Sequence, residues 1–285
     1  MPITSKNLSY IYNPKTKFKK QALEEVSFHL EEGGFVALVG RTGCGKSTLV
    51  QHLNALLSPT SGEIEIDEFH NTCEKRMKGK EIFKLREKVG VVFQFSEAQL
   101  FEETVEKDVS FGPKNFGLDN EKSLQKAHES LEMVGLDESF YKRSPFDLSG
   151  GEKRRVAIAG VLAYSPKYLI LDEPTAGLDP YGAKALMELF KKINESGVTI
   201  IFVTHDMNLV LGYASEVIVL DDGKLAYQGK PLELFEKDLS QFSLDSPLPY
   251  GLGRSLIGKG LPLDLSKCKD EDSLAEEIVK ARSGR

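Results

Sequence analysis

The stretch that decides the fold is FVALVGRTGCGKSTLVQHLNALL, residues 35–57. Its first five residues are all apolar, as in a strand buried on both faces of a sheet. Residues 40–47, GRTGCGKS, fit the phosphate-loop pattern G-x-x-x-x-G-K-[ST] between a strand and a helix. Glycines let backbone N–H groups approach phosphate oxygens, Lys46 supplies a positive charge, and the Ser47 hydroxyl can bind Mg²⁺. The stretch therefore predicts a nucleotide site.

The composition limits what else the chain can do. Its net charge of −6 disfavours a general nucleic-acid binder, which usually needs a basic face, although a local basic patch remains compatible with it. We find no run of about 18 apolar residues and no apolar amino-terminal run, so we expect a cytosolic chain that does not span a bilayer. The 3 cysteines are too few and too far apart for a disulfide framework or a zinc site, and reduced thiols are expected.

Apolar runs and alternating patterns predict strands on both sides of a helical insert. The expected strands cover residues 3–12, 23–30, 35–39, 61–67, 89–94, 168–172 and 198–205, and a hairpin with an Asp222-Gly223 turn covers 216–229. From Gln94 to about Leu162 the pattern is helical. Strands that alternate with helices indicate an α/β sheet, here interrupted by one helical insert.

After Pro231 the sequence changes character. An amphipathic helix is expected on the apolar positions Leu232, Phe235, Leu239 and Phe242. Residues 245–265 are rich in proline and glycine, and a short acidic helix is expected around 274–278. This tail is either packed on the core or a dimerisation element, and the residues alone leave both open.

A second apolar run ends in paired carboxylates. In LILDEP, residues 169–174, Asp172 follows the strand directly and suits the magnesium shell, while Glu173 is placed to orient or deprotonate an attacking water. Many strands end in acids, so the motif is weak alone. Paired with the phosphate loop it indicates nucleotide hydrolysis.

LSGGE, residues 148–152, decides the class of nucleotidase. Together with the phosphate loop before it and LILDEP after it, this run resembles the ATP-binding cassette (ABC) ATPases over residues 1–230. The resemblance implies an α/β fold of the P-loop NTPase (RecA-like) type with an antiparallel β subdomain. It divides the chain into a nucleotide-binding domain 1–230, with its core at 1–93 and 163–230 and a helical signature subdomain at 94–162, and a C-terminal helical extension 231–285, a possible dimerisation element.

The same resemblance assigns roles to single residues. The expected catalytic residues are Glu173, His205, Gln94 and Lys46. The expected ATP contacts are an adenine-stacking Tyr12 and the loop residues Gly40, Arg41, Thr42, Gly43, Cys44, Gly45, Lys46, Ser47 and Thr48. The expected Mg²⁺ ligands are Ser47, Gln94 and Asp172.

The signature run opens a helix, so its N–H groups and dipole face outward toward an anion. Within one chain that site has no phosphate to meet. The resemblance implies a head-to-tail dimer, in which two ATP molecules lie between the phosphate loop of one subunit and the signature of the other. The residues expected to act in trans are Ser149, Gly150, Gly151 and Asp179. Glu152 and Lys153-Arg154-Arg155 are interpreted as a solvated helix face without a catalytic role.

Residues 94–118 and 149–180 closely resemble the ATPases of energy-coupling-factor (ECF) importers, including cobalt-type ones. This implies a peripheral subunit at the cytoplasmic face of the cell membrane that drives import of vitamins or transition-metal ions. The implied partners are a second ABC ATPase, a heterodimer being preferred to a homodimer, a transmembrane coupling subunit and, indirectly, a substrate-binding membrane protein, with no nucleic acid. The alternatives are an ordinary binding-protein-dependent importer ATPase or an ABC ATPase that acts on nucleic acid or ribosomes.

The segment QFSEAQLFEETVEKD, residues 94–108, is acidic and carries two phenylalanines. Acids in such a segment often form a solvated face. If a membrane partner docks beside Gln94, they instead form an acidic rim for its basic coupling helices, around a groove lined by phenylalanines. We expect partner docking at Phe95, Glu97, Phe101, Glu102, Glu103 and Glu106.

Overall fold

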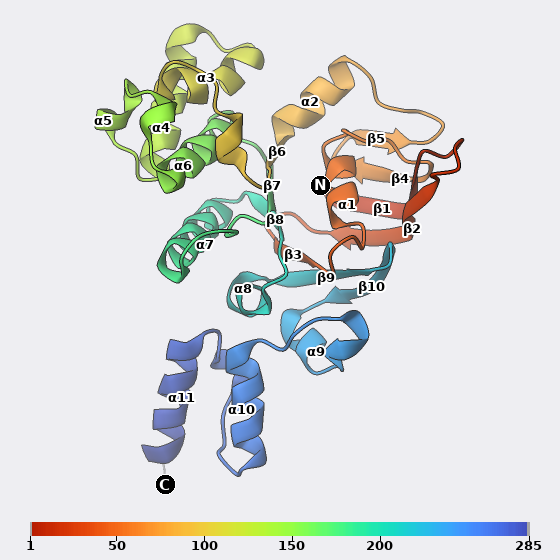
Figure 1. The fold of residues 1–285 in the computed structure, drawn as a ribbon, viewed down its shortest axis with the longest axis vertical. Helices are drawn as coiled ribbons and strands as arrows, with labels where there is room; N and C mark the ends of the chain where they lie inside the picture. The colour runs from red at the N-terminus through yellow and green to blue at the C-terminus, as the bar shows by residue number, and fades with distance from the viewer. Residues whose placement is uncertain (1, 284–285) are drawn as a thin grey trace.

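The computed structural model describes residues 2–283 and has a six-stranded sheet at its centre (Figure 1). The strand order is β10 (Lys224–Gly229), β9 (Glu216–Asp221), β3 (Phe35–Val39), β8 (Thr199–Val203), β7 (Tyr168–Asp172) and β6 (Val89–Val92). All neighbours are parallel except β9 and β10, which form the expected hairpin. Its Asp222-Gly223 turn has φ of 45° and 80°, the left-handed pair that a tight hairpin turn requires.

The central sheet is buried on both faces, which explains its continuous apolar runs. On β3, Phe35, Ala37 and Val39 face the main helical layer, while Val36 and Leu38 face the opposite layer. The helical side includes α7 (Pro180–Glu195) and α8 (Met207–Tyr213), and the other side includes α1 (Lys46–Leu53). The α/β class predicted from the alternation is confirmed.

A second, antiparallel sheet packs on the α1 side of the core. Its strand order is β2 (Lys20–Leu30), β1 (Ile3–Tyr12), β4 (Ser61–Ile66) and β5 (Phe69–Thr72). Three of these strands were expected from their patterns, but β5 was not, because its sequence FHNT is short and half polar. Antiparallel pairing with β4 makes this segment a strand.

The helical insert projects from the end of the central sheet that follows β6 (Figure 1). Before it, α2 (Lys80–Lys88) leads into β6. Its helices are η1 (Ser96–Gln99), α3 (Val105–Asn115), α4 (Asn120–Met133), α5 (Glu138–Tyr141), η2 (Pro145–Asp147) and α6 (Gly150–Leu162). The prediction of a helical pattern from Gln94 onward is wrong at its start, because only a short 3-10 turn and extended backbone precede α3.

The carboxy-terminal extension is more helical than its composition predicts. It contains α9 (Pro231–Phe235), η3 (Leu239–Phe242), α10 (Leu248–Gly258), η4 (Leu265–Lys267) and α11 (Glu271–Ser283). The single amphipathic helix expected from Leu232 to Phe242 is wrong, because Asp238 caps a separate turn. In Figure 1, α10 and α11 lie side by side at the end of the molecule opposite the helical insert. Within residues 2–283 no helix has the length and apolar character needed to cross a membrane.

Candidate functional site

The phosphate loop joins the buried strand β3 to α1 at the carboxyl edge of the central sheet. The Lys46 Nζ donates to the carbonyls of Gly40 at 2.6 Å and Arg41 at 3.1 Å, which holds its charge at the loop. Gly40 and Gly45 have φ of 142° and 112°. A Cβ on Gly40 would lie 2.2 Å from the Leu220 carbonyl oxygen, and one on Gly45 would lie 2.6 Å from that of Ala22. These two positions therefore require glycine.

Other residues expected to contact ATP surround this loop. The Cys44 side chain is buried beneath the loop. This burial raises the pKa of its thiol. Arg41 is half exposed and forms an ion pair with Asp221 at 3.4 Å. The Tyr12 hydroxyl lies 3.2 Å from Oγ1 of Thr48, and its ring packs edge-on against Tyr10. The structure thus brings Tyr12, from the antiparallel sheet, to the start of α1.

Two catalytic candidates meet at the ends of adjacent strands. β7 ends at Asp172, and β8 lies beside it, so Glu173 and His205 follow neighbouring strands. The His205 Nδ1 lies 3.1 Å from both Glu173 carboxylate oxygens. Glu173 has φ of 49°, a left-handed conformation that is strained for a non-glycine residue. Its N–H donates to the carbonyl of Val203 at 3.1 Å, which anchors this turn.

Asp172 lies within electrostatic reach of the phosphate-loop lysine. Burial raises the pKa of the Asp172 carboxyl, the negative Glu173 raises it further, and Lys46 opposes both. Ser47 lies at the first turn of α1, and Gln94 follows β6 with an exposed side chain. No group of three or more His, Cys, Asp and Glu residues within 2–283 could hold a metal by itself. Mg²⁺ is usually bound by one or two protein oxygen ligands together with phosphate oxygens of the substrate. Ser47, Gln94 and Asp172 offer oxygen donors of this kind.

The signature run begins α6 with a capping box. Ser149 is the N-cap: its N–H donates to Glu152 Oε2 at 2.7 Å, and the Glu152 N–H donates back to Ser149 Oγ at 3.4 Å. Glu152 is therefore a helix-capping residue in a partly exposed position. A Cβ on Gly150 or Gly151 would meet nothing within 4 Å. Packing inside the chain therefore does not require glycine at these two positions. The absence of side chains instead leaves the backbone N–H groups accessible to a molecule outside the chain.

Arg154 has a role that the sequence does not indicate. Its guanidinium, 11% exposed, donates to the carbonyls of Pro174 at 3.3 Å and Ala176 at 2.9 Å, and lies 3.5 Å from the Glu97 carboxylate. The interpretation of Arg154 as solvated is wrong. It connects the signature helix to the segments that follow Glu173 and Gln94, and only long-range contacts reveal this.

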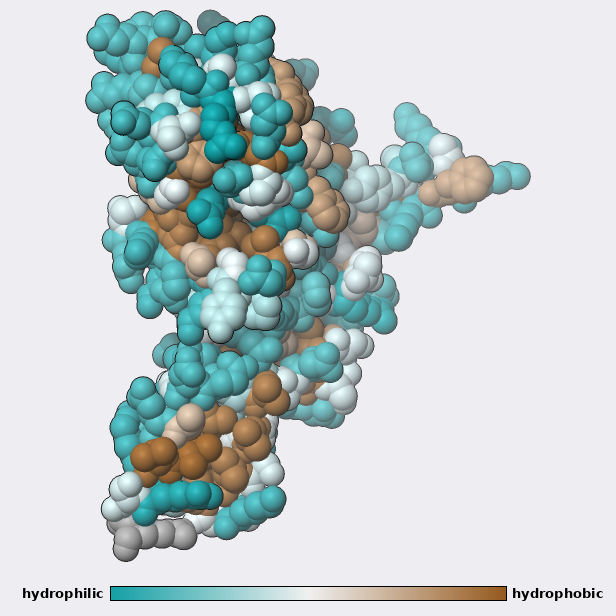
Figure 2. All heavy atoms as spheres, turned by 60° about the vertical axis from the view of Figure 1, so that its left-hand side comes forward, coloured by the Kyte–Doolittle hydropathy of each residue, from teal (hydrophilic) through white to brown (hydrophobic). Residues whose placement is uncertain are grey.

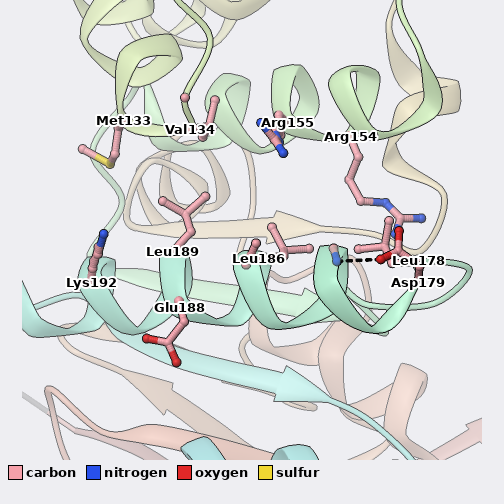
Figure 3. A pocket seen from close by; sticks show the side chains of 14 residues that line it. Met133, Val134, Arg154, Arg155, Leu178, Asp179, Leu186, Glu188, Leu189 and Lys192 are labelled. Carbon is pink, nitrogen blue, oxygen red and sulfur yellow. Dashed lines mark hydrogen bonds between the residues drawn. The ribbon is translucent and has the colours of Figure 1, made fainter.

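A cleft of about 440 Å³ lies between the helical insert and α7 (Figure 3). Gly151 and Arg154 line it from α6, and Leu178 and Asp179 line it from the turn before α7. Asp179 caps α7, because its Oδ1 accepts from the N–H groups of Tyr181 and Gly182 at 3.0 Å. The residues that line this cleft include none from the phosphate loop. Of the residues expected to act in trans, Gly151 and Asp179 thus line a cleft to which the phosphate loop contributes no residue.

The acidic segment is only partly exposed. Glu106 is buried, 6% exposed, and pairs with Lys142 and with His128 Nε2 at 3.1 Å, so its expected place on an exposed rim is wrong. Glu97 is half-buried beside Arg154. Phe95 and Phe101 are exposed, Glu103 is exposed, and Glu102 is half-buried. Of the residues expected to dock a partner, Phe95, Phe101 and Glu103 are thus exposed, and Glu97 and Glu102 are half-buried.

Comparison with known proteins agrees with these features. The family model described as "ABC transporter" matches residues 23–176. An energy-coupling factor transporter ATP-binding protein EcfA2 from Enterococcus faecalis is 46% identical, over 98% of this chain and 97% of its own length. A protein of the same name from Streptococcus pneumoniae serotype 2 is 51% identical, over 95% of this chain and 99% of its own length.

Solved structures give the same result. The cbiO1 protein from Clostridium perfringens, described as part of the ABC transporter complex cbiONQ, has a TM-score of 0.73 and 39% identity, covering 82% of this chain and 90% of that one. The bacterial ABC transporter cassette MJ0796, in a dimeric structure, has a TM-score of 0.70 and 35% identity, covering 80% of this chain and 98% of that one.

Proposed function

The chain belongs to the ABC transporter family, and we propose that it is the ATP-hydrolysing subunit of an energy-coupling-factor importer for vitamins or transition-metal ions. The observation that carries the proposal is the meeting of Glu173 and His205 at the edge of the sheet that also holds the phosphate loop. The ECF assignment is supported by relatives of that name that match nearly the whole chain.

In this proposal the chain's own residues bind and orient ATP. Tyr12 stacks on the adenine, and the loop N–H groups with Lys46 hold the β- and γ-phosphates. Glu173 accepts a proton from the attacking water, and the contact of His205 with both carboxylate oxygens fixes its direction. Gln94 contacts the same water from the end of β6. Backbone strain at Glu173 fits a position held for a catalytic purpose.

Ser47, Asp172 and Gln94 are proposed to hold Mg²⁺. Burial and the negative charge of Glu173 both raise the pKa of Asp172 despite Lys46, and a cation bound beside Asp172 would offset both effects. A magnesium ion held by these residues would supply positive charge that offsets the negative charge developing on the phosphates during hydrolysis. The three residues offer hard oxygen donors of the type that this ion prefers.

The second half of each ATP site is proposed to come from a partner ATPase. Ser149, Gly150 and Gly151 present open backbone at the start of α6, and Asp179 lies near them across the cleft. A helix N-terminus of this kind suits the γ-phosphate bound by the partner. A heterodimer with a related but distinct ATPase is preferred to a homodimer.

The carboxy-terminal extension is proposed as a further contact with that partner ATPase. Its base is packed on the core, since Leu234, Phe235 and Tyr250 belong to the main apolar core and the Leu248 N–H donates to Asn208 Oδ1. An apolar patch bordered by hydrophilic residues is exposed at this end of the molecule (Figure 2). The exposed apolar side chains on α10 and α11 include Leu248, Leu252, Ile257 and Val279. A second ATPase is the occupant that the split ATP site already requires.

A transmembrane subunit is proposed to dock beside Gln94. Phe101 packs edge-on against Phe111 at 4.9 Å, next to a groove of about 160 Å³. Asp108 fixes this edge, because its Oδ2 accepts from the N–H groups of Phe101 and Glu102. Phe95, Glu102 and Glu103 complete the surface offered to the partner. Glu97 lies behind this surface and contacts Arg154 through its carboxylate. In this proposal the chain is a peripheral subunit on the cytoplasmic face of the membrane.

Hydrolysis by the purified chain with its partner ATPase tests the proposal. Glu173→Gln should retain ATP binding within about threefold and lower single-turnover hydrolysis at this chain's site at least a hundredfold, the usual size of a general-base effect. Lys46→Ala should instead weaken ATP binding, which separates the two roles. Turnover of the Glu173→Gln site within a few-fold of the native rate would reject Glu173 as the base.

A further inference from the structure

The loop between β1 and β2 is strongly basic in an acidic protein. Residues 13–20 read NPKTKFKK, with Lys15, Lys17, Lys19 and Lys20 and no acid. All eight residues are exposed, and among residues 2–283 these four lysines have no ion-pair partner. Charges left unpaired and exposed in this way are available to an outside partner.

The loop is held in a defined shape that presents an aromatic ring. The Thr16 N–H donates to the Asn13 carbonyl at 3.0 Å, and the Phe18 N–H donates to Thr16 Oγ1 at 3.1 Å. Asn13 takes a left-handed φ of 49° that turns the chain. Phe18 is 84% exposed between lysines on both sides. The loop therefore presents one aromatic ring to the solvent among four lysines.

A second basic loop leaves the same region of the antiparallel sheet. Residues 73–79, CEKRMKG, carry Lys75, Arg76 and Lys78 against the single acid Glu74. Arg76 lies close enough to Tyr10, on β1, to oppose the rise in its pKa that burial causes. The two loops together hold 7 cations and 1 acid, while the rest of the chain has 30 cations against 42 acids. The positive charge is therefore local.

We propose that these two loops, residues 13–20 and 73–79, bind the anionic lipid headgroups of the membrane surface beside the importer, with Phe18 entering the interface. Lysines near an anionic leaflet attract it, and an aromatic ring between them adds apolar contact at headgroup depth. The proposal rests on the membrane location in the proposed function. It adds a direct lipid contact that does not pass through the transmembrane subunit.

The shape of this region favours a membrane over a nucleic acid. In Figure 1 the β1–β2 loop lies in the same half of the molecule as the helical insert, away from α10 and α11. In Figure 2 a narrow arm projects from the upper half of the molecule, the half in which Figure 1 draws this loop. Single-stranded nucleic acid is usually bound in a basic groove with several stacking aromatics. A projecting tip with one phenylalanine instead fits a flat surface.

Vesicle sedimentation of the full chain tests the proposal. We expect binding to vesicles of phosphatidylcholine with about 30% phosphatidylglycerol, little binding to pure phosphatidylcholine, and loss of binding in high salt, where screening is strong. The variant Lys15→Gln/Lys17→Gln/Lys19→Gln should bind about a hundredfold more weakly, at about fivefold for each lysine. Phe18→Ser should weaken binding several-fold.

A matched control removes the same charge elsewhere. Lys191→Gln/Lys259→Gln/Lys269→Gln changes three exposed lysines outside the loops and should bind vesicles like the native chain. An equal loss in the control, or equal binding to both vesicle types, would overturn the proposal. So would tighter binding of a 20-nucleotide single-stranded RNA than of anionic vesicles, or a loop variant that loses ATP affinity but not vesicle binding. The assay needs neither partner nor hydrolysis, so its failure leaves the proposed function standing.

Discussion

Replacing Arg154 tests whether the signature helix is tied to the catalytic segments. Methionine keeps most of the aliphatic stem but removes the donors to the Pro174 and Ala176 carbonyls and the contact with Glu97. Hydrogen bonds to a charged group contribute about 1.5–3 kcal/mol each, and longer ones less. With one bond at 2.9 Å and one at 3.3 Å, Arg154→Met should lower the free energy of unfolding by about 3 kcal/mol.

Part of that loss should come from the carboxylate left behind. The Oε2 atom of Glu97 is buried without a hydrogen-bond partner, so removing Arg154 leaves a poorly solvated charge. Arg154→Met/Glu97→Gln should therefore recover about 1 kcal/mol relative to Arg154→Met. Urea unfolding followed by circular dichroism measures the native chain and both variants.

The neighbouring arginine supplies the control. Arg155 is exposed, and among the described residues it forms no ion pair, so Arg155→Met should change stability by less than about 0.5 kcal/mol. ATP turnover should fall for Arg154→Met at temperatures where it is fully folded, because Ala176 lies between Glu173 and Asp179. Equal stability of the Arg154 and Arg155 variants would refute the reasoning.

Three further outcomes are expected. Gly151→Ala should leave folding intact or stabilise α6 by up to about 1 kcal/mol, since its Cβ meets nothing in this chain, yet abolish ATP hydrolysis in the dimer; normal hydrolysis would exclude a trans role. Burial raises the pKa of Glu106, but Lys142 and His128 lower it below the ordinary 4.5, so the native chain should be more stable than Glu106→Gln by about 2 kcal/mol at pH 7. That difference should vanish as pH falls through the lowered pKa; a constant difference in unfolding scans from pH 7 to 3 would contradict it. Glu102→Lys/Glu103→Lys should impair transport while ATP affinity is unchanged, and normal transport in vesicles would remove the acidic surface from docking.

Features set by local sequence were predicted well. Positions 40 and 45 of the phosphate loop require glycine because neighbouring backbone leaves no room for a Cβ. The sequence motif specifies glycine at these same two positions. The convergence of Glu173 and His205 was also predictable, because the carboxyl ends of parallel strands meet at one edge of a sheet. The family resemblance supplied the roles expected for the residues in these motifs.

Features set by distant contacts were not predictable. Glu106 is buried because Lys142, 36 residues later, pairs with it, and a row of acids in sequence does not reveal this. Arg154 reaches carbonyls 20 and 22 residues away. α10 was missed because glycine and proline suggested irregular chain, yet Pro249 lies in the first turn, where a missing N–H costs nothing.

The most direct test of the account is the set of proteins that co-purify with this chain from detergent-solubilised membranes of the cell that encodes it. The account predicts a second ABC ATPase in about equal amount and a membrane protein with several spans. The membrane protein should no longer co-purify when the docking surface of this chain is altered. Recovery of the chain with ribosomal proteins or nucleic acid, and without any membrane protein, would contradict it.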